Sequence, residues 1–212
     1  MKEILVPART HGRVLVREAT LPAALLVGFH GYLENAEIQM ERLTVIPGAH
    51  QWTLVSPQAL NRFYRGRTED VVAGWMTRQD REAAIDDNID YVNRVLEAVG
   101  APGVRIVFAG FSQGVAMAFR AAVRGTREGA GVIAVGGDVP PELLADASTT
   151  FPRVLLGRGD RDGWYTTARH DADLAALEAR GANAERLVYD GGHEWTTDVS
   201  AAAGRFISAL QP

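Results

Sequence analysis

The sequence predicts an α/β fold in which helices cover both faces of a mostly parallel central sheet. Three observations lead to this prediction. Apolar runs of strand length recur along the chain, several of them are continuous rather than alternating, and segments with a helical period stand between them. Continuous apolar strands are typical of parallel sheets that are buried on both faces. In such sheets the chemistry is found on the loops that follow the strands.

Three strands are predicted before residue 60. Residues 13–18, RVLVRE, alternate between apolar and charged side chains, which is typical of an edge strand. Residues 24–29, ALLVGF, are continuously apolar and predict a strand that is buried on both faces. Residues 51–57, QWTLVSP, predict a third strand that ends at Pro57. Residues 58–79 have no clear period and are predicted to form a loop.

Helices and strands alternate over the rest of the chain. Residues 80–100 place apolar side chains at helical spacing on one face, and Gly100 is a stop signal. Because the connection between the strands at 131–137 and 153–159 is short, no large helical lid is expected there. Further strands are predicted at 104–110, 131–137, 153–159 and 185–192, and further helices at 114–124, 168–181 and 197–210.

The composition is that of a soluble globular protein with one domain, residues 1–212. Hydrophobic residues make up 47% of the chain, and the net charge of −4 does not favour a nucleic-acid partner. The absence of cysteine excludes disulfides, thiolate metal sites and cysteine nucleophiles. No signal peptide and no apolar run long enough for a membrane span is found, so we expect a cytoplasmic protein.

One serine stands between two glycines at the junction of a predicted strand and a predicted helix. Residues 110–114 read GFSQG, which matches the G-x-S-x-G pattern of a nucleophile elbow. The sharp turn places Ser112 in a strained backbone conformation, and Gly110 and Gly114 let the strand and the helix approach closely. The helix N-terminus stabilises negative charge that develops beside it. We therefore expect Ser112 to be an exposed nucleophile.

A serine hydroxyl needs a base, and one of the five histidines suits this role best. In folds with this elbow the acid and then the histidine follow the serine along the chain. His170 lies among predicted helix residues, where a solvated surface histidine is expected, whereas His193 follows the last strand on a glycine-rich loop. The pattern therefore favours His193 as the base.

Three carboxylates follow strands at the same predicted edge of the sheet. Asp138 comes after the strand at 131–137, and Asp160 and Asp162 come after the strand at 153–159. One of them is expected to orient His193. The others are expected to shape turns, a role that aspartate often has.

An oxyanion hole requires backbone N–H groups near the nucleophile. One is expected from Gln113, the residue after the nucleophile, and one from the loop after an early strand. Residues 27–35, VGFHGYLEN, form that loop, and Gly31 allows the backbone to turn the N–H of Tyr32 toward the site. His30 precedes the serine and is expected to be structural.

Five short stretches carry a resemblance to a known family. They are FHGYLEN at 29–35, GWM at 74–76, GFSQG at 110–114, GRGDRD at 157–162 and YDGGHEW at 189–195. In this order, and over nearly the whole chain, the sequence resembles the phospholipase/carboxylesterase family of α/β-hydrolases, which includes acyl-protein thioesterases and small bacterial carboxylesterases. The resemblance implies the α/β-hydrolase fold and a triad of Ser112, Asp162 and His193. It also implies Tyr32 and Gln113 as oxyanion donors and Trp75 near the acyl site.

Two stretches depart from the family pattern. Residues 163–165, Gly-Trp-Tyr, stand where proline and small aliphatic residues are expected, and the stretch before Asp138 is altered. Both changes lie on the expected pocket wall. We predict that Trp75, Trp164 and Tyr165 line the acyl side of the substrate pocket.

A cluster of three arginines in the predicted loop at 58–79 has two interpretations. Arg62, Arg65 and Arg67 belong either to a solvated loop or to an anion contact at the pocket mouth.

The combined pattern predicts a serine hydrolase that cleaves carboxylic esters or thioesters of small molecules. A serine peptidase of the same fold is the alternative enzyme. A non-catalytic binding protein would be expected to lack a member of the triad, and none is missing. No cofactor and no metal are expected, because nucleotide-binding glycine motifs are absent, and HEWTT at 193–197 has Thr197 where a zinc site requires histidine.

Overall fold

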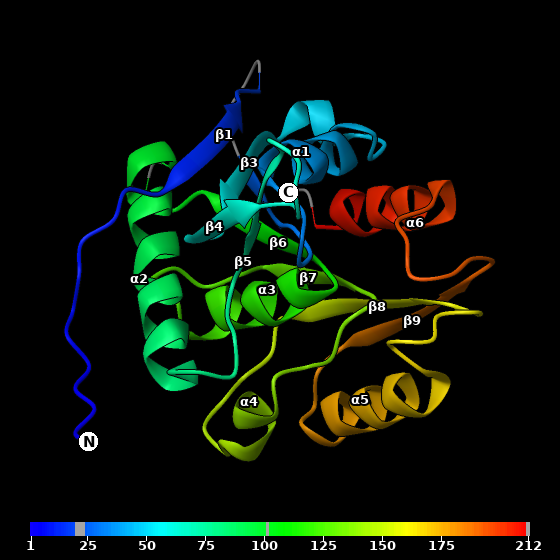
Figure 1. Cartoon of the computed structure of the whole chain (residues 1–212). Coiled ribbons are helices and arrows are strands. Elements are labelled where there is room, and N and C mark those ends of the chain that lie inside the picture. Colours follow the sequence, from blue (N-terminus) through cyan, green and yellow to red (C-terminus); the bar gives the residue numbers. More distant parts are fainter. Residues whose placement is uncertain (20–23, 101, 211–212) are drawn as a thin grey trace.

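A seven-stranded sheet runs through the computed structural model, which describes residues 1–19, 24–100 and 102–210 (Figure 1). The strand order is β1-β3-β2-β6-β7-β8-β9. β1 (Arg13–Arg17) is an edge strand antiparallel to β3, and the other neighbours in this sheet are parallel. The mostly parallel sheet predicted from the sequence is confirmed. The remaining strands are β2 (Ala24–Phe29), β3 (Thr53–Gln58), β6 (Arg105–Phe111), β7 (Gly131–Val135), β8 (Arg153–Gly159) and β9 (Ala184–Tyr189).

Helices cover both faces of this sheet (Figure 1). α1 (Ala36–Thr44) and α6 (Thr197–Ser208) pack on one face, together with the short 3₁₀ turn η1 (Ala49–Gln51). The opposite face is covered by α2 (Arg81–Val99), α3 (Gln113–Arg124), α4 (Pro141–Ala145) and α5 (Thr167–Ala179).

The central strands are continuously apolar because their side chains pack into two hydrophobic cores, one on each face of the sheet. In β2, Leu25 and Val27 belong to the core under α2 and α3, whereas Leu26 between them belongs to the core under α1 and α6. Alternate side chains of a strand point to opposite faces, so a strand covered on both sides must be apolar at every position.

The long helix follows the sequence pattern closely. Ile85, Ile89, Val92 and Leu96 of α2 are buried, and the helix ends at Gly100. Apolar residues at spacings of three and four therefore give the face that packs on the sheet.

Two local predictions need correction, and one helix was missed. β3 does not end at Pro57 but continues to Gln58. Its pairing with β2 stops at Val55, so the nitrogen of Pro57, which carries no hydrogen, is not required to donate a hydrogen bond to β2. Residues 58–79 are not only loop, since β4 (Asn61–Tyr64) and β5 (Val71–Gly74) form a two-stranded antiparallel sheet. The helix α1 directly after the loop at 27–35 was not predicted.

The connection between β7 and β8 contains the short helix α4 and no lid domain, as expected. Among the described helices, none is both long enough and apolar enough to cross a membrane.

Candidate active site

Ser112 lies at the sharp turn between β6 and α3. Its backbone has a φ of 53° and a ψ of −121°, which is the strained conformation expected for an elbow. The two glycines are sterically required. A Cβ on Gly110 would lie 2.4 Å from the carbonyl oxygen of Gly114, and a Cβ on Gly114 would lie 2.1 Å from that of Phe29.

The structure brings Ser112 together with His193 and Asp162. Nε2 of His193 is 2.9 Å from the Ser112 Oγ, and Nδ1 is 2.8 Å from Oδ2 of Asp162. The three residues follow β6, β9 and β8, so they meet at the carboxyl edge of the sheet. A carboxylate can only accept, so Nδ1 carries the proton, and Nε2 is left to accept from the serine hydroxyl.

The second carboxylate oxygen of Asp162, Oδ1, is fixed by hydrogen bonds from the backbone. Its side chain is buried, and Oδ1 accepts hydrogen bonds from the backbone N–H groups of Trp164 at 2.8 Å and Tyr165 at 3.0 Å. The turn that follows β8 therefore fixes the orientation in which Oδ2 faces the imidazole.

The other two candidate acids have different partners. Asp160 accepts from the N–H of Gly191 at 3.0 Å, a bond that lowers the pKa of this exposed carboxyl and ties the loops after β8 and β9 together. Asp138 is exposed and lies 3.4 Å from Nη1 of Arg169. Of the three candidate acids, only Asp162, which the family resemblance favoured, contacts His193.

The two other histidines near the core have structural surroundings. His30 is fully buried, Nε2 accepts from the N–H of Ala59 at 3.1 Å, and Nδ1 is 2.7 Å from the carbonyl oxygen of Gly31. Burial lowers the pKa of His30. The expectation for His170 was wrong, because this residue is buried against β8, with Nε2 3.0 Å from the carbonyl oxygen of Leu156.

The loop that carries Tyr32 is braced by an ion pair that the sequence analysis missed. Glu34 accepts from the N–H of Gly31 at 2.7 Å and binds Arg42 of α1 through both oxygens, at 2.6 and 2.7 Å. Within the described part of the chain, the backbone N–H groups of Tyr32 and Gln113 have no acceptor. Both residues border the pocket at Ser112, so these two donors are free to bind an oxyanion.

Replacing Glu34 with glutamine is expected to lower the stability at pH 7 by about 1–3 kcal/mol, because a bidentate, largely buried ion pair is lost. Burial raises the pKa of Glu34, but the Arg42 guanidinium and the N–H of Gly31 together hold this pKa below its usual value of 4.5. This contribution is therefore complete above pH 4.5 and is lost as the pH falls through the lowered pKa. Urea unfolding of wild type and variant between pH 3 and 7 should give curves that converge at acid pH.

The matched control is Glu37→Gln, which breaks the pair with Arg13 at the surface of α1. An exposed pair contributes no more than about 1 kcal/mol. A Glu37 variant that loses as much stability as the Glu34 variant would contradict the assignment.

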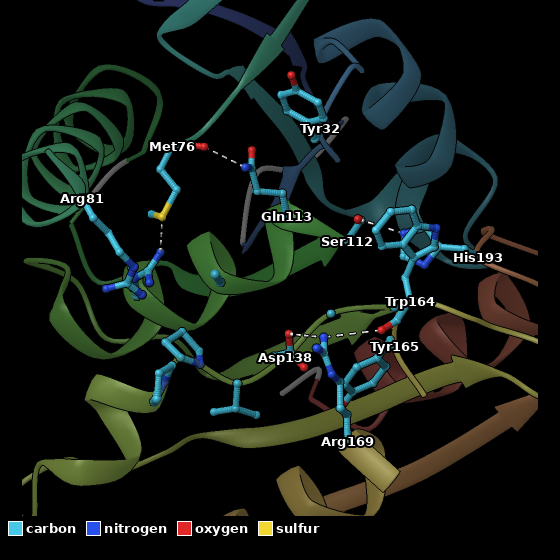
Figure 2. Close-up of a pocket in the computed structure, with 17 residues that line it drawn as sticks. Tyr32, Met76, Arg81, Ser112, Gln113, Asp138, Trp164, Tyr165, Arg169 and His193 are labelled. Atoms are coloured by element: carbon cyan, nitrogen blue, oxygen red, sulfur yellow. Dashed lines mark hydrogen bonds and ion pairs between the residues drawn. The ribbon is translucent and has the colours of Figure 1, made fainter. Parts of the chain in front are cut away.

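The side chain of Gln113 has a role that the elbow motif did not indicate. Its Oε1 accepts from the N–H of Trp75 at 2.7 Å, and its Nε2 donates to the carbonyl oxygen of Met76 at 3.0 Å. The amide therefore fastens the chain after β5 to the elbow (Figure 2).

Ser112 and His193 line a pocket of about 520 Å³ (Figure 2). Trp164 stands at its rim, 78% exposed, and Tyr165 forms part of the wall, with its hydroxyl donating to Asp173 at 2.9 Å. Burial and the nearby Asp173 carboxylate raise the pKa of the Tyr165 phenol, which stays protonated.

The placement predicted for Trp75 needs correction. Its side chain is 0% exposed, packs edge to face with Phe29, and donates its indole N–H to the carbonyl oxygen of His30. The neighbouring residue Met76 borders the pocket instead. Trp75 therefore supports the site from the core.

The cluster of Arg62, Arg65 and Arg67, in and after β4, lies outside this pocket. Arg62 donates to the carbonyl oxygen of His11, and Arg65 donates to that of Leu33, while Arg67 is exposed. The pocket is bordered by three different arginines, Arg81, Arg120 and Arg169. The sequence did not single these out, because they come from separate helices.

Comparison with known proteins gives one consistent result. A family model described as phospholipase/carboxylesterase matches residues 12–210. No curated protein sequence matches the chain significantly.

Solved structures of low sequence identity share the fold. Acyl-protein thioesterase 2 of Zea mays is 19% identical with a TM-score of 0.74, over 94% of this chain and 99% of that one. A phospholipase/carboxylesterase of Dyadobacter fermentans is 21% identical with a TM-score of 0.71, over 93% and 97%. The carboxylesterase of Bacillus cereus is 14% identical with a TM-score of 0.72, over 94% and 95%. Because the family model spans nearly all of the sequence, the chain belongs to the phospholipase/carboxylesterase family, with the fold of the α/β-hydrolases.

Proposed function

We propose that this protein is a serine esterase or thioesterase that cleaves small-molecule substrates in the cytoplasm through an acyl-enzyme on Ser112. One observation carries the proposal. The Ser112 hydroxyl, the His193 imidazole and the buried Asp162 carboxylate are joined by hydrogen bonds of 2.9 and 2.8 Å at the border of a pocket. Membership of the family supports the same class of reaction.

In the acylation step, the Ser112 Oγ attacks the carbonyl carbon of the substrate while Nε2 of His193 takes the hydroxyl proton. Asp162 stabilises the imidazolium that forms and keeps the ring in the required tautomer. The N–H groups of Tyr32 and Gln113 bind the oxyanion. The tetrahedral intermediate then collapses, and His193 gives its proton to the departing alcohol or thiol.

In the deacylation step, water takes the place of the leaving group. His193 removes a proton from the water as the water oxygen attacks the acyl carbon. Collapse of the second intermediate breaks the bond to Oγ, returns the proton to Ser112, and releases the carboxylic acid. The sequence of steps consumes one water and needs no cofactor.

The direct test combines turnover with labelling. The intact protein should hydrolyse p-nitrophenyl acetate and butyrate, and a fluorophosphonate should modify Ser112 alone and abolish that activity. A protein that is not labelled and hydrolyses neither ester would be a binding protein of this fold. Labelling of another residue with loss of activity would also overturn the proposal.

Among uncharged esters, we expect kcat/KM to be highest for short acyl chains and to fall toward palmitoyl. The pocket of about 520 Å³ is bordered by Trp164 and the prolines Pro140 and Pro141, and Arg81 and Arg120 also line it. A long apolar chain would have to pass or desolvate these guanidinium groups.

The measurement is a series of p-nitrophenyl esters from acetate to palmitate below their critical micelle concentrations. Because no lid domain covers the site, activity should not jump when the concentration of a long-chain ester is afterwards raised through its critical micelle concentration. A steady rise of kcat/KM with chain length would contradict this expectation.

A further inference from the structure

One face of α3 leads from the nucleophile to a buried arginine. Gln113, Ala116 and Arg120 are spaced three and four residues apart, and all three border the pocket. Arg120 lies eight positions after Ser112, which corresponds to about 12 Å along a helix axis. Arg120 and Ser112 thus line the same pocket from two positions on one helix.

Arg120 is buried, with its side chain only 1% exposed, yet its guanidinium is incompletely paired. Nε and Nη2 both donate to the same oxygen of Glu142, at 2.8 and 2.7 Å. Nη1 has only the thioether sulfur of Met76, at 3.8 Å, and sulfur is a weak acceptor. Two of the five N–H groups of Arg120 therefore have no acceptor among the described residues.

The same carboxylate also serves a second arginine. Arg81, at the start of α2, lies 3.2 Å from the other oxygen of Glu142, and its side chain is 43% exposed. Figure 2 places Arg81 and Met76 across the pocket from His193. Two guanidinium groups thus share one carboxylate, which leaves one positive charge in excess. At the rim, Arg169 and Asp138 form an ion pair whose opposite charges cancel.

A positive charge in excess beside a buried surface favours an anionic ligand, because a guanidinium without a counter-charge is costly to desolvate. The arginine fork matches the geometry of a carboxylate. Arg81 is the group that a carboxylate reaches first. The flexible side chain of Met76 covers Nη1 of Arg120 and can turn aside at low cost.

We propose that the substrate carries a carboxylate several atoms away from the scissile carbonyl, and that Arg81 and Arg120 bind it. A half-ester or half-thioester of a dicarboxylic acid has this chemistry on the acyl side, and an ester of a hydroxy acid has it on the alcohol side. The inference rests on the proposed function, because it names the substrate class of the same pocket.

The test compares matched pairs of esters. On the acyl side, mono-p-nitrophenyl adipate is compared with p-nitrophenyl hexanoate, which has the same chain length without the charge. On the alcohol side, 6-acetoxyhexanoate is compared with hexyl acetate by titration of the acid released. The wild type should prefer the charged member of at least one pair by tenfold or more in kcat/KM. The pair of esters that shows the preference identifies whether the carboxylate lies on the acyl side or the alcohol side of the substrate.

Arg81→Met should reduce that preference to within about twofold, mainly by lowering kcat/KM for the charged ester. The matched control is Arg124→Met, which removes the same charge from an exposed position of α3 that does not border the pocket. Arg120→Met should act in the same direction, but loss of a buried arginine can disturb folding. The partly exposed Arg81 therefore decides the outcome.

A second readout does not depend on turnover. Calorimetry should give tighter binding of adipate to the wild type than to Arg81→Met. If uncharged esters are hydrolysed and neither charged ester is preferred, the inference is wrong and the proposed function stands. If no ester is hydrolysed, the proposed function fails, and equal binding of adipate to both proteins would overturn the inference as well.

Discussion

Ser112→Ala is expected to lower kcat by about 10⁶, because the hydroxyl, its base and the acid that orients the base act as one unit. The remaining activity would come from the oxyanion donors and substrate binding alone. Alanine keeps the Cβ of serine, so the strained backbone at φ 53° is unchanged. The melting temperature of the variant should therefore stay close to that of the wild type.

The measurement is kcat on p-nitrophenyl butyrate, with thermal melting as the check on folding. Ser148→Ala is the control, because this serine is exposed and, within the described ranges, its hydroxyl bonds to Asp146 alone. The control should keep full activity. A Ser112 variant that folds and retains more than one hundredth of the wild-type kcat would mean that another group is the nucleophile.

The elbow could be predicted from the sequence because its signal is local. Two glycines flank Ser112, an apolar run precedes it, and a helical pattern follows it, so strand, turn and helix are all specified within about 20 residues. His193 could be predicted because glycines and the end of the last strand surround it. In both cases neighbours in the sequence are also neighbours in space.

The bracing of the site could not be predicted, because it depends on pairs that lie far apart in the chain. Trp75 looked like a pocket residue, but it fills the core below the loop of His30. The contact of Gln113 with residues 75–76 spans nearly forty positions. The pair of Glu34 and Arg42 required the helix α1, which the sequence analysis had not predicted.

The prediction of Asp162 as the acid depended on its place in the loop and on the family resemblance, for a related reason. Asp138, Asp160 and Asp162 all follow strands at one edge of the sheet, so composition and order do not distinguish them. Only the path of the turn after β8 decides which carboxylate faces Nδ1. That turn buries Asp162 and leaves Asp160 on the surface, bound to the N–H of Gly191.

Asp162→Asn is accordingly expected to lower kcat by about 10⁴, the scale of the corresponding exchange in serine proteases. Asparagine keeps the shape and can still accept from the N–H groups of Trp164 and Tyr165. It cannot stabilise the imidazolium, and if its NH₂ group faces Nδ1, the ring takes the wrong tautomer. The loss should therefore appear in kcat, while KM changes little.

Asp160→Asn and Asp138→Asn are the matched controls, with the same chemical change at the same edge of the sheet. Both carboxylates are exposed and contact neither His193 nor Ser112, so both variants should stay within about tenfold of the wild-type kcat. Thermal melting separates loss of catalysis from collapse of the loop, because the Asp162 variant retains its backbone contacts. An inactive Asp138 variant beside an active Asp162 variant would show that the acid is supplied after β7 and that the contact of Asp162 with His193 is only structural.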